Sequence, residues 1–439
     1  MQPPRAPAVP ALAALGPKAR THWWRVAWQR SRPPFLRRLV AGCAVAALRG
    51  SNAQEHGGVA PVSAVPFEYS KASDLQNQVK AVEYFEEHFY NAGKVWALDE
   101  QRLQEADQLR QRALQEPVLA LAAAQVLYLY SWFRTTGEII RENILAAAQL
   151  FERSIGVAAC DRRLPIDVWV DAACDVRWSH AAMLYNWLGE TSADAAQAAG
   201  FIDRGRLLLE SLKEHPRFTT VGKSWTSVQH INFNALRFPG VPSRTFWDSS
   251  QVPLARFLEE HHPTFRAELE AIATHERDLY EELRRIDGSK ECLATPGGWD
   301  TVRIVRYGHW FDLLCELAPR TCELLRSRPE VSNCKFVNAN YQKLYPGSHL
   351  KPHFGNSPRL AAHLAVIAPE PLRAGMTVGG DKTFWREGRV VVFDDTFAHA
   401  VSHWGTAPRF VLNIWFCHPC DDDNAHGQTC PKLETDAFD

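Results

Sequence analysis

Short apolar runs separated by turn residues fill the stretch from Asn340 to His418, and this pattern constrains the fold more than any other feature of the chain. The runs Leu364–Ile367, Val390–Phe393 and Phe410–Trp415 are bounded by Gly, Pro, Asn and Asp. Short apolar runs with such boundaries are typical of β-strands joined by tight turns. We therefore expect a small all-β barrel in this part of the chain.

Two histidines and one arginine lie beside turns or strand starts in this stretch. His353 and His399 are each next to a turn, and Arg409 follows ten residues later at the start of an apolar strand. Neutral imidazole is a common metal ligand, and two of them on neighbouring strands can bind Fe(II). A guanidinium on an apolar strand needs an anionic partner, and a carboxylate matches it best. The alternatives are hydrogen-bonded core or rim histidines, and a structural ion pair from Arg409 to an acid of the same domain.

Three further polar residues of the barrel are candidates for the same site. Arg359 and His363 are four residues apart, so strand alternation places both on one face, which is either the barrel interior or the solvent side. Asp395, just before His399, is a candidate for binding water beside a metal, although paired acids in turns are often solvated or form caps. The usual iron triad has a carboxylate two residues after its first histidine, where this chain has Gly355.

The charge distribution argues against nucleic-acid binding. The net charge of the 439 residues is −1, but residues 1–54 hold nine Lys and Arg and no acid. The rest of the chain therefore has 40 basic and 50 acidic residues. Binding to phosphates needs a basic face, which this balance does not favour.

Residues 1–54 have the composition of a targeting segment. Basic residues precede an apolar run from Leu39 to Leu48, which is too short to span a bilayer of about 30 Å. A secretory signal, a signal anchor and an organelle transit peptide all fit, so we expect the secretory pathway, the endoplasmic reticulum or another organelle. Membrane association through this segment is a further possibility.

The middle of the chain has helical periodicity. We expect a linker at 55–74 and an all-helical domain at 75–215, with helices near Leu103–Leu114, Val118–Phe133, Ile139–Ile155 and Ala173–Leu188. A tetratricopeptide-like stack and a plain helical bundle fit about equally, since no clean repeat is present. The barrel domain with its flanking helices is expected at 216–420 and an acidic tail at 421–439, so the predicted fold class is α+β.

Cysteine spacing leaves several interpretations open. Cys417 and Cys420, followed by His426 and Cys430, resemble a zinc knuckle, but a disulfide or free thiols also fit. Cys315 and Cys322 are seven residues apart, and a small disulfide loop between them is expected in an oxidising compartment.

Taken together, an ordered series of segments resembles the aspartyl/asparaginyl β-hydroxylase family over roughly residues 230–420. The series comprises Tyr345–His353, Arg359–Leu364, Trp385–Gly388, Val392–His399 and Arg409–Phe410 with Trp415, and upstream Ala318–Cys322 and Phe246–Trp247. The family consists of Fe(II)- and 2-oxoglutarate-dependent dioxygenases on a double-stranded β-helix, a jelly-roll or cupin-like fold. The resemblance implies an enzyme that uses O2, with ascorbate as a support, and hydroxylates the β-carbon of Asp or Asn in a protein substrate.

The resemblance also implies roles for individual residues. His353 and His399 would bind iron, with water in place of the missing carboxylate, and Arg409 and His363 would hold the two ends of 2-oxoglutarate. Two positions depart from the family pattern: Gln342 stands where a Ser is common, and Ala361 where an Arg is common, for which Arg359 is a substitute on the same face. Other members of the family hydroxylate lipids or small molecules. An alternative from a different functional class is a catalytically silent barrel that binds a peptide or protein.

Overall fold

The computed structural model describes most of the chain from residue 74 to residue 419. The described residues are 66, 68, 71, 74–86, 88–89, 100–133, 139–157, 174–213, 227–230, 244–274, 279–287, 293–294, 298–334, 337–355 and 359–419. The predicted targeting segment at 1–54, the acidic tail and Cys420, His426 and Cys430 lie outside them. Within the described residues, no helix is both long and apolar enough to cross a bilayer.

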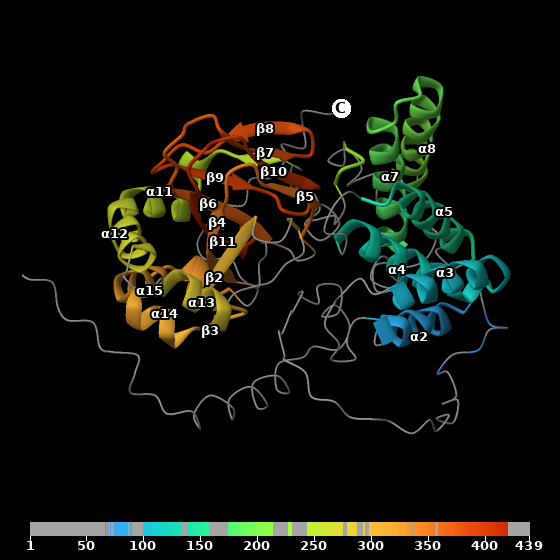
Figure 1. Ribbon diagram of the computed structural model, residues 1–439, viewed down its shortest axis with the longest axis horizontal. Coiled ribbons are helices and arrows are strands. Elements are labelled where there is room, and N and C mark those ends of the chain that lie inside the picture. The colour runs from blue at the N-terminus through green and yellow to red at the C-terminus, as the bar shows by residue number, and fades with distance from the viewer. Residues whose placement is uncertain are drawn as a thin grey trace, which may run out of the picture.

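The N-terminal half is helical, as its periodicity predicts, and lies to one side of the sheets (Figure 1). Its elements are α2 (Leu75–Glu86), α3 (Glu100–Gln115), the 3-10 turn η3 (Pro117–Leu119), α4 (Ala120–Phe133), α5 (Arg141–Val157), α7 (Cys174–Glu190) and α8 (Ala195–Lys213). Each helix from α3 to α8 packs against the next described helix along the chain. Residues 118–124 are all buried, because the small alanines of α4 let the neighbouring helices approach closely. The tetratricopeptide-like interpretation stays a prediction.

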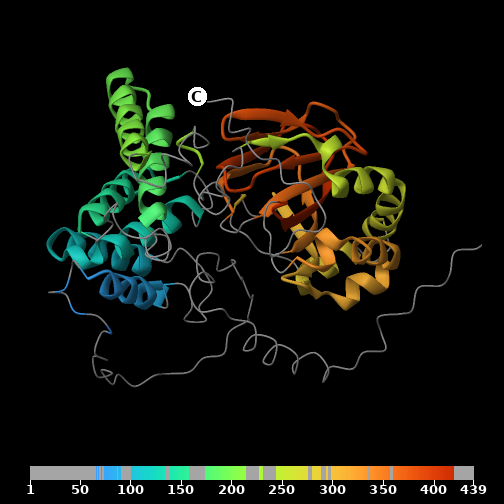
Figure 2. The ribbon, with the colours of Figure 1, turned by 180° about the vertical axis from the view of Figure 1, so that it is seen from behind.

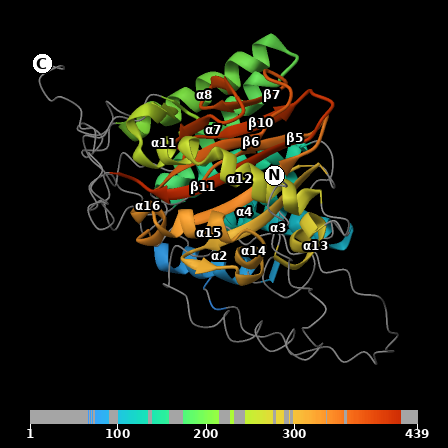
Figure 3. The same ribbon diagram turned by 90° about the vertical axis from the view of Figure 1, so that its left-hand side faces the viewer.

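A second group of helices covers the outer face of the larger sheet, and Figure 3 shows several of them in front of its strands. Figure 2, which views the molecule from the side opposite to Figure 1, shows the same helices at the right, beside the strands. They are α11 (Pro253–Glu260), α12 (His262–Ala273), α13 (Leu279–Asp287), α14 (Asp312–Leu317), α15 (Pro319–Arg326) and α16 (Pro329–Ser332), with a 3-10 turn η4 (Ser249–Gln251). Helix α12 ends at Ala273, where the Thr274 N–H and hydroxyl both donate to the Glu270 carbonyl.

Eight antiparallel strands form the barrel, and successive strands alternate between two sheets, except that β7 and β8 are neighbours in the smaller sheet. They are β4 (Asn338–Leu344), β5 (His349–His353), β6 (Arg359–Ile367), β7 (Ala374–Val378), β8 (Asp381–Phe384), β9 (Val390–Phe393), β10 (His399–His403) and β11 (Arg409–Cys417). The larger sheet has the order β1-β9-β6-β11-β4-β2-β3, and the smaller one β5-β10-β7-β8. Strands β1 (Phe246–Trp247), β2 (Trp299–Arg306) and β3 (His309–Trp310) extend the larger sheet. This alternation is the double-stranded β-helix, or jelly-roll, order that we predicted.

Strand alternation divides the apolar residues of the larger sheet between two cores. Ala362, Leu364 and Leu412 face the covering helices, whereas Ala361 and Val411 face the barrel interior. Arg359 and His363 share the interior face with Ala361, and both are almost fully buried. Of the two faces that the sequence allows for this pair, the structure therefore has the interior one.

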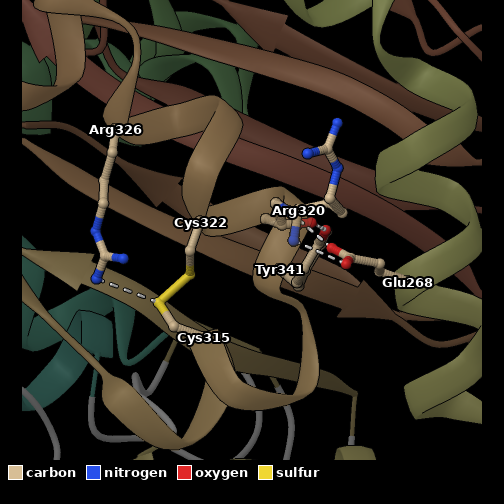
Figure 4. Close-up of a disulfide and its surroundings, with 7 residues drawn as sticks. Glu268, Cys315, Arg320, Cys322, Arg326 and Tyr341 are labelled. Atoms are coloured by element: carbon tan, nitrogen blue, oxygen red, sulfur yellow. Dashed lines mark hydrogen bonds between the residues drawn. A yellow bond between two sulfur atoms is a disulfide. The ribbon is translucent and has the colours of Figure 1, made fainter. Parts of the chain in front are cut away.

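Two disulfides link described elements. Cys315 and Cys322 join α14 to α15, as predicted, and Figure 4 shows the bond beside Arg326, whose Nη2 lies 3.9 Å from Cys315 Sγ. Cys417 pairs with Cys334, 83 residues earlier. The zinc-knuckle interpretation is therefore wrong for Cys417, because a disulfide sulfur is not available as a thiolate ligand.

The Cys334–Cys417 disulfide should stabilise the barrel more than the Cys315–Cys322 disulfide does. The longer loop holds all eight barrel strands, and crosslinking a longer loop removes more entropy from the unfolded chain. Replacing Cys334 and Cys417 with Ser should lower the free energy of unfolding by about 3 kcal/mol, and the matched change at the shorter loop by about 2 kcal/mol. Urea unfolding of both double variants measures the difference. An equal or larger loss at the short loop would contradict this expectation.

Candidate active site

The two histidines of the predicted metal site lie together at one end of the smaller sheet. His353 is the last residue of β5 and His399 the first of β10, and the two residues are paired across these neighbouring strands. Their ring centroids are 4.1 Å apart. A register irregularity between His399 and Val401 follows at once, and irregularities of this kind re-aim side chains next to functional sites.

Both imidazoles are oriented by the same local hydrogen bond. The Nδ1 of His353 lies 2.8 Å from the Lys351 carbonyl oxygen, and the Nδ1 of His399 lies 2.9 Å from that of Phe397. A ring nitrogen facing a carbonyl carries the proton, so Nε2 carries the lone pair that can bind a metal. Burial holds the pKa of His399 well below its usual value, which keeps this ring neutral. His399 therefore has the donor atom and the protonation state that Fe(II) requires, and His353 is oriented in the same way.

Gly355 explains why this site has no third ligand at the usual carboxylate position. A Cβ built on Gly355 would lie 2.2 Å from Oδ2 of Asp395. The Gly355 N–H also donates to the Asp395 carbonyl at 2.5 Å. Asp395 thus fills the space that a side chain at position 355 would need. Among the described residues, no group of three His, Cys, Asp or Glu side chains is arranged to hold a metal.

Asp395 is held beside the histidines by an ion pair with Arg359. The Oδ2 of Asp395 accepts from Nε and Nη2 of Arg359 at 3.0 and 2.9 Å. Its Oδ1 is buried and has no hydrogen-bond partner in the part of the chain that the structure describes. Burial raises the pKa of Asp395, whereas the charges of Arg359 and His353 and hydrogen bonds from the side chains of Arg359 and Trp415 oppose this rise. One oxygen of the carboxylate is therefore available to bind water next to the imidazoles.

Aromatic rings line the interior between the histidine pair and Arg409. Phe393 lies 5.1 Å from His399 and 4.9 Å from His363, measured between ring centroids. His363 stacks on Trp385 at 5.9 Å, and the Arg409 guanidinium lies 4.2 Å from the centroid of the Trp385 indole. Ring contacts thus run without a break from the histidine pair through Phe393, His363 and Trp385 to the guanidinium.

Arg409 is buried with unused hydrogen-bond donors. Its side chain is 2% exposed, and its Nε and Nη1 have no partner among the described residues. Burial lowers the pKa of Arg409 to about 9. The described ion pairs do not include one to Arg409, so the alternative of a structural ion pair has no support there. Since a buried cation without a counter-charge is costly, a carboxylate ligand fits this position.

The remaining predicted residues are Gln342, His363 and Arg359. Gln342 is buried on the interior face of β4, opposite Val411 and one step along that face from Leu344, which is opposite Arg409. His363 has a buried Nδ1 without a partner in the described structure, next to Asn413 on β11. Arg359 is engaged by Asp395, so its geometry favours positioning that carboxylate over binding a cosubstrate.

Trp385, Phe393 and Asn413 are the interior residues to which sequence reasoning assigned no role. Trp385 and Phe393 stood inside segments that resemble the family, but a single aromatic residue on a strand is more often part of a core. Asn413 interrupts an apolar strand, and this was the signal that could have identified it.

Substituting Gly355 with Asp should not create a third metal ligand. The new Cβ would overlap the Asp395 carboxylate, and the carboxylate of the new aspartate would repel that of Asp395. We expect the variant to lose about 3 kcal/mol of folding stability and to bind metal no better than the parent protein. Thermal unfolding and a metal titration measure both. Gly200→Ala is the control, because a Cβ at Gly200 meets no atom within 4 Å. Tighter metal binding by the Gly355 variant would refute this explanation.

Residues 259–419 match the model of the Aspartyl/Asparaginyl beta-hydroxylase family, which confirms the predicted resemblance over this segment. Human aspartate beta-hydroxylase domain-containing protein 2 is 37% identical over 41% of this chain and 49% of its own length. Human aspartyl/asparaginyl beta-hydroxylase is 28% identical over 41% of this chain and 23% of its own. An ornithine lipid ester-linked acyl 2-hydroxylase of Rhizobium tropici is 25% identical over 45% of this chain and 66% of its own. The chain thus spans less than two thirds of the length of each of these relatives.

Proposed function

We propose that this chain, which resembles the aspartyl/asparaginyl β-hydroxylase family over residues 259–419, is an Fe(II)- and 2-oxoglutarate-dependent dioxygenase. The reaction converts a substrate C–H, O2 and 2-oxoglutarate into the C–OH product, succinate and CO2. The iron supplies the oxygen chemistry when it is bound, and the protein supplies the positions of the reactants.

The observation that carries this proposal is the coexistence of two features inside one barrel. Two imidazoles lie with their ring centroids 4.1 Å apart, each with Nδ1 on a backbone carbonyl, and a buried guanidinium in the same barrel keeps Nε and Nη1 unused in the described structure. An iron site and a carboxylate clamp need these two features respectively. A silent binding barrel has no need for either, since each leaves polar atoms buried at a cost.

The predicted site residues other than the two histidines, together with Trp385, each have a role in this proposal. Arg409 binds the far carboxylate of 2-oxoglutarate, and Trp385 covers one face of its guanidinium and excludes water. His363 and Gln342 are the nearby polar groups for the rest of the cosubstrate. Asp395, held by Arg359, accepts a hydrogen bond from water beside the histidines and so takes the place of the missing carboxylate ligand.

For the substrate, we propose the β-carbon of an Asp or Asn residue in a protein. Two of the three relatives above carry aspartyl, asparaginyl or aspartate β-hydroxylase in their names. A second candidate is a lipid acyl chain, which is favoured by one observation: of the three relatives above, the Rhizobium tropici acyl 2-hydroxylase has the largest share of its length covered.

We also propose that the protein folds in an oxidising compartment, in line with a secretory or endoplasmic reticulum location. Both described disulfides are buried in or next to the barrel core, and the described residues include no free cysteine. Disulfides of this structural kind form in the secretory pathway and are rare in the cytosol.

The test is an assay of 2-oxoglutarate turnover by the full chain. The protein is incubated with Fe(II), ascorbate and O2, and with Asp- and Asn-containing peptides or with aminolipids, and succinate and hydroxylated product are measured by mass spectrometry. Succinate that rises with a peptide supports the protein hydroxylase, and succinate that rises with a lipid supports the second candidate. Peptide binding without any succinate would favour the silent binding module.

A further inference from the structure

We propose that two segments preceding the barrel, helix α4 and residues 227–230, position both metal-binding histidines, through contacts to the two residues whose carbonyls orient the imidazoles. This inference rests on the proposed function, because it assigns Lys351 and His230 as positioning residues for the same metal site. The two carbonyls belong to Lys351 and Phe397. Each of these residues is held by a segment that precedes the barrel.

The first contact is between β5 and helix α4. The Lys351 ammonium donates to the Trp132 carbonyl at 2.9 Å, and the Trp132 indole N–H donates to the Pro352 carbonyl at 2.7 Å. Trp132 is 1% exposed, and burial lowers the pKa of Lys351. Phe354, on the other side of His353, meets the ring of His180 from α7 at 5.1 Å. The strand that ends in His353 is therefore held on both sides by the helical half.

The second contact is between the loop before β10 and the segment 227–230. The Ala398 N–H donates to the Gln229 carbonyl at 2.6 Å. The His230 ring stacks on Phe397 at 4.2 Å and 5°, and its Nε2 lies 3.2 Å from the Thr396 hydroxyl. Ala398 itself lies in the hydrophobic core of the helical half. The loop that carries Asp395 and leads to His399 is thus fixed from outside the barrel.

These contacts matter for metal binding because they hold the backbone of Lys351 and Phe397, whose carbonyls orient the two histidine rings. A ring that can rotate about its side-chain bonds presents Nε2 to the metal only part of the time, and groups that orient metal ligands change metal affinity by roughly 10- to 100-fold. Lys351 and His230 act one contact further out, so we expect an effect at the lower end of that range for each.

The experiment measures Co(II) binding to the full chain by visible absorption, without 2-oxoglutarate or O2. Lys351→Met keeps the aliphatic stem and removes the ammonium, and His230→Ala removes the ring. We expect each to raise the Co(II) dissociation constant roughly 10-fold and to alter the absorption bands of the bound ion. Lys351→Arg should restore the affinity, and Lys382→Met, on the exposed edge strand β8, should leave it unchanged.

The outcomes separate this inference from the proposed function. A parent protein that binds no Co(II) would overturn both. A parent protein that binds Co(II), with Lys351→Met within twofold of its affinity, would overturn the positioning role alone. The melting temperature of the metal-free variants is recorded in parallel, and a lower melting temperature with unchanged affinity would show a merely structural contact. If His230→Ala fails to fold, the Co(II) affinities of Lys351→Met and Lys351→Arg decide whether the positioning role holds.

Discussion

Replacing His399 with Ala should abolish succinate release from 2-oxoglutarate, with a loss of at least about 1,000-fold and no residual dependence on added iron. His399 and His353 are the two described imidazoles at the barrel end, with rings 4.1 Å apart, and the alanine variant leaves a single protein ligand. One ligand holds Fe(II) too weakly to sustain turnover, and the same result is expected for His353→Ala. The measurement is succinate by mass spectrometry at saturating iron, with and without substrate.

The matched control is His349→Ala, which removes an exposed histidine from the same strand as His353. Because His349 lies four residues before His353 at the other end of β5, we expect near-parental activity. Unaltered succinate release by either barrel-histidine variant would remove the iron assignment, and with it the dioxygenase proposal.

Replacing Arg409 with Met should weaken 2-oxoglutarate binding by roughly 1,000-fold, which corresponds to about 4 kcal/mol for loss of a buried charge pair. The same change should leave the ligand-free protein as stable as the parent or more so. In the ligand-free structure the guanidinium is buried with Nε and Nη1 unpartnered in the described chain, and methionine removes that cost while filling much of the space. Arg409 thus reduces stability without the cosubstrate and increases it with the cosubstrate.

Thermal unfolding with Mn(II), at increasing 2-oxoglutarate, tests both parts. The parent protein should gain melting temperature with cosubstrate, because a ligand that binds only the folded state stabilises it, and the Met variant should not. Arg389→Met is the control, since the Arg389 side chain is 71% exposed and pairs with Glu259 at the surface. An Arg409→Met protein that responds to 2-oxoglutarate like the parent would contradict the role of Arg409 as the carboxylate clamp.

Much of the barrel and its candidate ligands could be predicted from local patterns. The strands at Leu364–Ile367, Val390–Phe393 and Phe410–Trp415 lie where the apolar runs and turn residues indicated. The shared face of Arg359 and His363 followed from the alternation of side chains along a strand. These features depend on residues a few positions apart, so the sequence contains them directly.

Which residues from distant parts of the chain pair with each other could not be predicted in this way. Local patterns left open whether Arg359 would serve a cosubstrate, whether Cys417 would bind zinc, and whether Arg409 would pair with an acid of its own domain. The structure pairs Arg359 with Asp395 and Cys417 with Cys334, and leaves Arg409 without an acid among the described residues. The register between β6 and β11 and the packing of the loop before β10 decide these partners.

By itself, the sequence determined the helical first half, the positions of the main barrel strands along the chain and the two histidines and one arginine that the barrel displays, because backbone preferences and side-chain alternation act within a few residues. Only the tertiary structure decided that Asp395 fills the space beside Gly355, and that Trp132 contacts a strand 220 residues away. Such contacts exist only once distant segments pack together, and the energy that selects them comes from burial and hydrogen bonding between those segments.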